Sequence, residues 1–396
     1  MRNARAAKVE RALPMAPALV FLVALNLRPA LSAVGPLLPE IGSRLGLAEG
    51  TQGVLGALPL VGFGLISSVV HHASRRLGIE RTVLLSLMAL VAGIVVRSYC
   101  GEPGLWVGTI TAGCAIAVGN VLLPAIVRRD YSAHISRATS IYSACITVSA
   151  SIGSAVAVPL STATDWNDAL AFWAIPALIV LVLWLPRALP AAPYQDPRQA
   201  GNEPAASLWR QPTAWLVTAF MGLQSTTFYI MATWLPTIEV AAGVSARQAG
   251  LRLFLYQLVG VVSGLAIPRL MWRHGSQAAA VTASAPMLVG VLGILLVPAL
   301  SVAWIIVAGL GSGAALVVAL SLISLRGGTP HETARLSGMA QSLGYLLAST
   351  GPFLAGHLTQ RTGTWTLSLI LLAGLGVTQL LVAVPAGRER KLTNVR

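Results

Sequence analysis

Long apolar runs decide what this chain can fold into. The sequence holds about twelve stretches of roughly 20 mostly apolar residues, separated by short segments that carry nearly all the charges. A run of this length lets an α-helix cross the hydrocarbon core of a bilayer. Charged residues make up only 10% of the chain, whereas soluble domains have about 25%. The sequence therefore predicts an all-α membrane protein and argues against a soluble helical domain.

The apolar runs and the residues that interrupt them place twelve transmembrane helices. In chain order they cover residues 14–38, 51–70, 82–100, 104–127, 138–161, 167–186, 212–238, 247–268, 277–298, 302–325, 334–358 and 364–385. The longest interruption is rich in Pro and polar residues, and it divides the chain into two sets of six. We predict an N-terminal six-helix bundle at 1–186, a cytoplasmic central loop at 187–211 and a C-terminal six-helix bundle at 212–396.

The distribution of Lys and Arg predicts the orientation in the membrane. With the N-terminus inside, the inner segments carry 21 of the 27 basic residues, so the positive-inside rule places both termini in the cytoplasm. The first apolar run follows four basic residues, as in a signal peptide, but it exceeds the usual 7–15-residue apolar core. We expect an uncleaved first helix in a bacterial inner membrane. Because topology accounts for the net charge of +14, we expect no nucleic-acid partner.

The two halves resemble each other at an offset of 197 or 198 residues. Arg128 and Arg137 recur as Arg326 and Arg335, and the Leu-Pro pair at 38–39 recurs at 235–236. A parallel six-plus-six repeat is typical of the major facilitator fold, in which the substrate site lies between the halves near the bilayer midplane.

Arg28 is the strongest candidate for a substrate contact. It lies inside the first apolar run, where an arginine costs roughly 2.5–3.5 kcal/mol. Its counterpart in the second half is the uncharged segment 225–227, so the repeat does not require the charge. A guanidinium can bind a carboxylate, a nitro group or cyanate, and it can stack on an aromatic ring. The alternative is a structural arginine whose donors bond to carbonyl groups of neighbouring helices.

Three motifs carry a resemblance to a known family. Residues 26–29 are Asn-Leu-Arg-Pro, followed by Gly-Pro-Leu-Leu-Pro at 35–39; residues 119–124 are Gly-Asn-Val-Leu-Leu-Pro; residues 336–348 are Leu-Ser-Gly-Met-Ala-Gln-Ser-Leu-Gly-Tyr-Leu-Leu-Ala. On these motifs the chain resembles the cyanate and 2-nitroimidazole transporter family of the major facilitator superfamily, closest to the 2-nitroimidazole branch. The resemblance extends over nearly the whole chain. It implies transport of a small nitrogen-containing solute, either anionic or aromatic.

One loop departs from the superfamily pattern. The connection between helices two and three usually reads Gly-x-x-x-Asp-Arg-x-Gly-Arg, but Arg75 stands here where the aspartate belongs. The gate contact usually assigned to that aspartate cannot be carried over. Glu80 is a candidate replacement, and with the neighbouring Arg76 it forms our predicted gate on the inner side.

Further candidates for substrate binding are polar or aromatic side chains inside apolar helices. They are Asn26, Asn120, Tyr142, Gln224, Tyr229, Arg252, Tyr256, Gln257, Gln341 and Tyr345. Gln341 and Tyr345 are four residues apart and share one helix face, while Gln224 is close to the repeat position of Arg28. For the uncharged residues the alternative is hydrogen bonding between helices. For Arg252 it is snorkelling to the headgroups, which we also expect of Arg97.

The acidic residues are informative by their positions. None of the thirteen lies deep in an apolar run, so the sequence does not favour a proton relay through a buried carboxylate. Glu40 and Glu239 stand at the outer ends of the first and seventh helices, in similar places in the two halves. We predict that they are gate or interface residues.

The sequence gives no indication of an enzyme. It contains no nucleophile–base constellation and no Walker motif, and the glycine-rich segment 309–313 lies in an apolar run without a preceding strand. The three cysteines have no metal-ligand spacing, and we expect neither a metal nor a cofactor. Two functions remain open: efflux of 2-nitroimidazole-type heteroaromatics, and import or exchange of cyanate or another small anion. We expect a monomer in the lipid bilayer.

Overall fold

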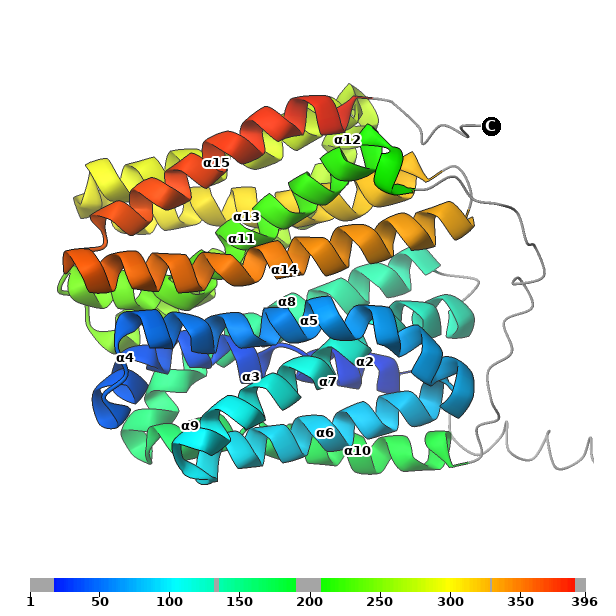
Figure 1. The fold of residues 1–396 in the computed structure, drawn as a ribbon, viewed down its shortest axis with the longest axis horizontal. Coiled ribbons are helices and arrows are strands. Elements are labelled where there is room, and N and C mark those ends of the chain that lie inside the picture. Colours follow the sequence, from blue (N-terminus) through cyan, green and yellow to red (C-terminus); the bar gives the residue numbers. More distant parts are fainter. Residues whose placement is uncertain (1–17, 132–134, 190–207, 328–329, 389–396) are drawn as a thin grey trace, which may run out of the picture.

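The computed structural model describes residues 18–131, 135–189, 208–327 and 330–388, and within them every regular element is a helix (Figure 1). In chain order the helices are α2 (Leu19–Asn26), α3 (Pro29–Ser32), α4 (Val34–Leu45), α5 (Glu49–Leu77), α6 (Ile79–Tyr99), α7 (Gly101–Asp130), α8 (Ile135–Ala163), α9 (Trp166–Ala171), α10 (Ala174–Ala188), η2 (Leu208–Arg210), α11 (Pro212–Ala241), α12 (Ala246–Leu296), η3 (Pro298–Leu300), α13 (Ser301–Arg326), α14 (Pro330–Thr362) and α15 (Thr366–Gly387). Most of the predicted central loop lies outside the described residues.

These helices form the twelve predicted membrane crossings in two bundles of six. Eight segments of the described chain are long and apolar enough to span a bilayer. One of them is α12, which doubles back at Gly275 and supplies two crossings. The remaining crossings are α5, α11 and α14, which have 29, 30 and 33 residues.

The first crossing is interrupted at Leu27–Arg28. Helix α2 ends at Asn26, and Pro29 begins the single turn of α3. Proline has no backbone N–H, so the helical ladder is broken there. The carbonyl of Arg28 accepts hydrogen bonds from the backbone N–H groups of Leu31 at 3.0 Å and Ser32 at 2.9 Å. Arg28 therefore sits at a helix break in the middle of the crossing.

Glycines at matching positions turn the chain in both bundles. Gly46 and Gly243 have φ of 65° and 90°, and Gly78 and Gly275 have φ of 89° and 82°. Each pair is separated by the offset seen in the sequence, and these positive φ values favour glycine. We call the side of the turns at Gly46 and Gly243 the Gly46 end, and the opposite side the Gly78 end. They lie at the left and the right of Figure 1.

An arginine caps the last helix of each bundle at the Gly78 end. Arg81 donates to the carbonyls of Ala188 at 3.4 Å and Leu189 at 3.3 Å, at the end of α10. Arg326 donates to the carbonyls of Ala386 at 3.3 Å and Gly387 at 3.0 Å, at the end of α15. A cation is favourable at a helix C-terminus because it offsets the partial negative charge of the last carbonyls.

The two bundles meet closely at the Gly46 end. A Cβ added at Gly53 of α5 would lie 2.5 Å from the carbonyl oxygen of Pro352 in α14. One added at Gly250 of α12 would lie 3.1 Å from the carbonyl oxygen of Ser154 in α8. These two contacts are related by the repeat. Backbone thus packs directly on backbone between the bundles, and this end of the protein is closed.

Candidate functional site

A cavity of about 400 Å³ lies between the bundles near the middle of the crossings. Its wall comes from α3 and α4, α5, α7, α8, α11, α12, α13 and α14. Arg28 is the only charged residue among the described residues that line it. A ligand in this cavity therefore meets a single fixed positive charge.

The guanidinium of Arg28 is held among aromatic side chains. Its Nη1 donates to the hydroxyl of Tyr229 at 2.7 Å, and its Cζ lies 5.8 Å from the ring centroid of Phe63. The phenols of Tyr142 and Tyr345 are its other electrostatic neighbours. Phenols solvate the cation without neutralising it, so Arg28 keeps its charge and retains donors for an anion or a nitro group.

Five aromatic rings form a continuous series beside Arg28, and all of them except the buried Phe63 line the cavity. The centroid of Phe63 lies 5.4 Å from that of Tyr345, and the centroid of Tyr345 lies 6.5 Å from that of Tyr229. Phe228 follows at 4.9 Å from Tyr229, and Tyr256 at 6.2 Å from Phe228. We call these five residues the aromatic series. The four on the wall offer ring faces and edges to a planar ligand.

Two of the predicted amides also line the cavity. Gln224 donates from Nε2 to Ser225 Oγ at 2.7 Å, and Gln257 donates from Nε2 to Ser154 Oγ at 3.1 Å. The second bond joins α12 to α8 and therefore links the two bundles. Each amide keeps its carbonyl oxygen as an acceptor for a ligand N–H.

Five of the predicted substrate contacts do not line the cavity. Asn26 donates to the carbonyl of Leu22 at 2.9 Å within its own helix, and Gln341 donates to Ser337 Oγ at 2.7 Å. Asn120 and Arg252 are also absent from the wall. Tyr142 is buried beside Arg28 behind the wall. The structure thus places Arg28, Gln224, Tyr229, Tyr256, Gln257 and Tyr345 together on the wall.

Arg252 forms an ion pair with Glu239. The carboxylate of Glu239 is only 2% exposed, and Arg252 Nη1 also donates to Ser301 Oγ at 2.8 Å. This pairing joins α11, α12 and α13 within the second bundle. Arg252 therefore neither lines the cavity as a substrate contact nor snorkels to the headgroups. Its charge is matched by the buried carboxylate of Glu239.

The other predicted gate residues have partners within the first bundle or lie exposed. Glu40 accepts a hydrogen bond from Ser161 Oγ. Glu80 pairs with Arg129 at 2.6 Å, at the Gly78 end. Arg76 is exposed. Glu80 thus supplies a carboxylate near the loop that lacks the usual aspartate.

The expectation that Arg97 snorkels is wrong. Its side chain is 1% exposed, and Nη1 donates to the carbonyl of Ala30 in α3 at 2.8 Å. A position at the end of an apolar run predicts a side chain that reaches the headgroups, but tertiary packing encloses this one. Phe63 and Phe228 were also missed. An aromatic residue in an apolar run carries no signal of its own, although Phe228 is adjacent to Tyr229.

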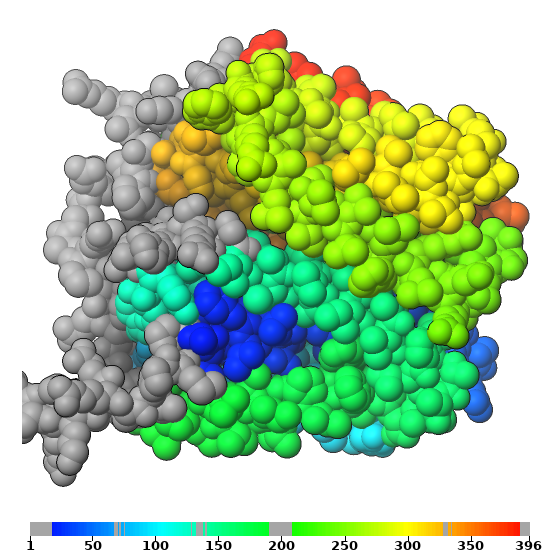
Figure 2. All heavy atoms as spheres, turned by 180° about the vertical axis from the view of Figure 1, so that it is seen from behind, coloured from blue at the N-terminus to red at the C-terminus, as the bar shows by residue number. Residues whose placement is uncertain are grey.

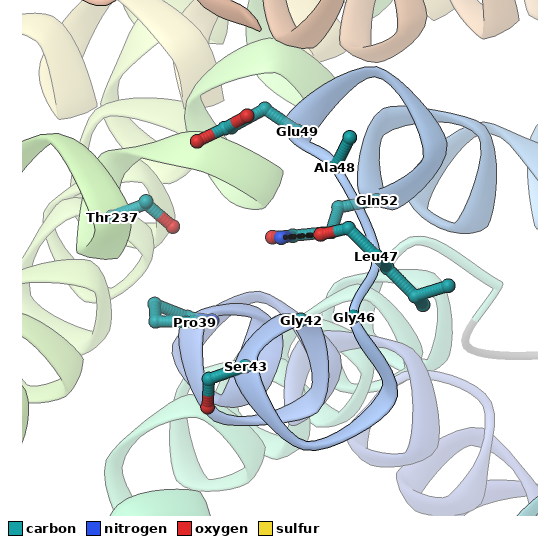
Figure 3. Close-up of a pocket in the computed structure, with 9 residues that line it drawn as sticks. All are labelled: Pro39, Gly42, Ser43, Gly46, Leu47, Ala48, Glu49, Gln52 and Thr237. Carbon is teal, nitrogen blue, oxygen red and sulfur yellow. Dashed lines mark hydrogen bonds between the residues drawn. The ribbon is translucent and has the colours of Figure 1, made fainter.

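A second hollow lies at the Gly46 end, between α4, α5 and α11 (Figure 3). Its volume is about 530 Å³, and Gln52 Nε2 donates to the carbonyl of Leu47 across it at 2.8 Å. It is larger than the central cavity but open, and its lining contains neither an aromatic ring nor a cation. We therefore assign the candidate site to the central cavity.

Comparisons with known proteins agree with this architecture. A family model described as Major Facilitator Superfamily matches residues 20–352. The 2-nitroimidazole transporter of Escherichia coli (strain K12) is 36% identical over 381 residues, covering 94% of this chain and 95% of that protein. The cyanate transport protein CynX of the same strain is 27% identical over 370 residues, covering 91% and 94%.

Solved structures show the same fold. The crystal structure of a D-xylose-proton symporter superposes with a TM-score of 0.75 at 14% identity, covering 95% of this chain and 99% of that one. Twelve crossings in two bundles, a central cavity and these matches identify a multi-pass membrane transporter rather than an enzyme. The chain belongs to the Major Facilitator Superfamily, in the family of cyanate and 2-nitroimidazole transporters that its motifs predict.

Proposed function

We propose that this transporter exports 2-nitroimidazole-type heteroaromatics, with Arg28 as the residue that anchors them. The hydrogen-bonded placement of Arg28 among the aromatic series is the observation that carries the proposal. A planar ring can lie between these side chains while its nitro oxygens, or a deprotonated ring nitrogen, accept from the guanidinium. Gln224, Tyr256 and Gln257 then orient the remaining polar atoms.

The side from which this state is open follows from where the cavity extends. Its wall continues along α12 to Pro268 and along α13 to Leu320, toward the Gly78 end, while the Gly46 end is closed. Basic residues are concentrated at the Gly78 end, so we assign that end and both termini to the cytoplasm. The structure then represents a state that loads ligand from the cytoplasm.

Alternating access would follow from movement of the bundles. We propose that residues 1–186 and 212–396 rock about the cavity as two bodies joined by the cytoplasmic segment 187–211, and that one chain suffices. Glu40, Glu239, Arg76 and Glu80 lie toward the two ends of the crossings. There they would help to set which end is open.

The test is ligand binding to the purified full-length protein in lipid nanodiscs. Isothermal titration should detect 2-nitroimidazole binding to the wild type and a loss of at least tenfold in affinity in Arg28→Gln. The exposed Arg247, which lies at the Gly46 end, supplies the control variant Arg247→Gln. Unchanged affinity in a folded Arg28→Gln sample would contradict the proposal.

The second candidate function is transport of cyanate or another small anion. The lack of a carboxylate among the described residues of the cavity wall favours it, because Arg28 is then balanced only by a ligand. Titration with cyanate under the same conditions separates the two candidates. Binding of cyanate in preference to 2-nitroimidazole, abolished by Arg28→Gln, would support the anion carrier.

A further inference from the structure

The central cavity extends beyond what the Arg28 site requires. A volume of about 400 Å³ lies in the range of roughly 300–1,000 Å³ that holds drug-sized ligands. Cyanate has three atoms, and 2-nitroimidazole is one five-membered ring with a nitro group. Either ligand at Arg28 leaves most of the cavity unfilled. The chemistry of the remaining wall indicates what else enters it.

On α12 and α13 the wall toward the Gly78 end is apolar, while α8 adds the hydroxyls of Ser143 and Thr147 to the lining. On α12 the lining residues run from Tyr256 to Pro268, a length of roughly 18 Å along the helix. On α13 they continue to Leu320. We define the apolar subsite as the part of the wall formed by the last three lining residues of each helix that carry an apolar side chain, which leaves out Gly264. They are Val261, Leu265, Pro268, Leu316, Val317 and Leu320.

These side chains are not buried by the protein itself. Leu265 is 56% exposed and Leu320 is 43% exposed, although both line the cavity. Helix α12 runs beside α8 on the face shown in Figure 2, and the subsite lies on the inner side of α12. Apolar surface that remains open in a binding cavity favours an apolar ligand group, because covering it removes that surface from water.

We propose that the natural substrate is an amphipathic aromatic anion larger than 2-nitroimidazole, whose apolar substituent occupies the apolar subsite. This inference rests on the proposed function, since Arg28 and the aromatic series hold the polar ring. The chemistry of the ligand is inferred from the lining of the cavity. Arg28, the only cation among the described lining residues, and the six apolar residues of the subsite line one and the same cavity. A ligand that fills both parts must carry an acidic or nitro-bearing ring at one end and hydrocarbon at the other.

A homologous series of ligands tests the subsite. The series is 2-nitroimidazole with hydrogen, methyl, ethyl or propyl at ring carbon 4, which leaves the ring N–H intact. Each is titrated into the full-length protein in lipid nanodiscs. Burying one CH₂ group improves affinity by up to about fourfold. We expect affinity to rise at each step in the wild type.

Two substitutions locate the effect. Leu320→Ser should flatten the gain along the series while leaving the affinity for the parent compound unchanged. Leu265→Trp should fill the subsite, so that the propyl compound binds at least tenfold more weakly than to the wild type. Leu300→Ser is the matched control, because Leu300 is exposed and lies outside the cavity wall.

The outcomes separate this inference from the proposed function. If the parent compound binds through Arg28 but affinity does not rise along the series, the subsite is disproved and the proposed function stands. The same holds if Leu320→Ser and Leu300→Ser give equal slopes. If no compound depends on Arg28, the proposed function fails. A rising series whose slope is lost in Leu320→Ser supports the inference.

Discussion

At the scale of single residues, two arginines meet at the interrupted first crossing, one within it and one reaching it from α6. Arg28 precedes the single turn of α3, and Arg97 donates to the carbonyl of Ala30 within that turn. Arg97 is fully enclosed, and its Nε and Nη2 have no partner in the described part of the chain. Enclosing a cation without a carboxylate is costly. We infer that the hydrogen bond from Arg97 to the carbonyl of Ala30 holds the segment that carries Arg28 in place, and that this role offsets the cost of burying the cation.

We predict that Arg97→Gln lowers affinity for 2-nitroimidazole about tenfold by releasing this segment, and that Arg97→Lys retains part of the affinity because it keeps one donor. The loss should not add to that of Arg28→Gln. Titration of both single variants and the double variant gives the coupling free energy. Thermal unfolding of each variant, measured in parallel, reports any general loss of stability.

A purely structural role would give a different result. Arg97→Gln would then lower the unfolding temperature, while its effect on ligand affinity would be absent or simply additive with that of Arg28→Gln. If Arg97→Gln lowers ligand affinity by the same factor with and without Arg28→Gln, Arg97 does not act by positioning Arg28.

The sequence predicts Arg28 but not its surroundings, for a physical reason. A charge in an apolar run is conspicuous, because its insertion cost demands an explanation. Phe228 has no such cost, so nothing in the local sequence separates an aromatic residue that lines the cavity from one that faces lipid. Arg252 was conspicuous too, yet its partner Glu239 stands thirteen residues earlier on a different helix. Only the packing of α11 on α12 shows that the two charges cancel.

At the scale of helices, apolar periodicity predicts the crossings well because the bilayer fixes their length. Prolines also mark two interruptions. The first crossing breaks before Pro29, as the proline suggests. The sixth breaks between α9 and α10, at Phe172–Trp173. Pro176 lies four residues after Phe172 and has no N–H to donate to its carbonyl, so the helical ladder cannot continue there.

Closure of the Gly46 end depends on glycine contacts between helices, which gives a prediction for Gly53. A methyl group at Gly53 meets the backbone of Pro352, which cannot move without shifting α14. Gly53→Ala should therefore separate α5 from α14 and favour the state open at this end. Gly250→Ala should act in the same direction but less, because its nearest atom is farther away.

Cysteine labelling measures this opening. Thr233 lines the cavity near the Gly46 end and is buried. In a background without the native cysteines, Thr233→Cys should react with a water-soluble maleimide about tenfold faster when combined with Gly53→Ala. Gly374→Ala is the control, because a Cβ there has no neighbour within 4 Å. Equal labelling rates with Gly53→Ala and Gly374→Ala would show that the contact of Gly53 with Pro352 does not keep the Gly46 end closed.

At the scale of the whole molecule, the charge of the cavity determines which steps of the transport cycle move charge. The pair of Glu239 and Arg252 is neutral as a unit, and no carboxylate occurs among the described residues of the cavity wall. The empty cavity therefore carries the single charge of Arg28. Binding of a monovalent anion cancels it. The loaded carrier should change its access side without moving net charge, while the empty carrier moves a positive charge and encloses it unpaired, which is costly.

Two consequences follow for reconstituted vesicles at a pH where the ring N–H of 2-nitroimidazole is ionised. Exchange of ligand for ligand should exceed net efflux, because exchange avoids the return of the empty carrier.

Net efflux should also respond to voltage. A potential negative inside attracts the positive empty site back to the interior, with up to about 2.3 kcal/mol per 100 mV for a charge that crosses the whole field. Net efflux from loaded vesicles should thus accelerate severalfold under a valinomycin-clamped potential, negative inside, while exchange stays constant. Arg28→Gln removes the charge, so any residual net efflux it supports should lose this acceleration. Exchange that responds to voltage as strongly as net efflux would show that the ligand crosses uncharged or that another charge moves with it.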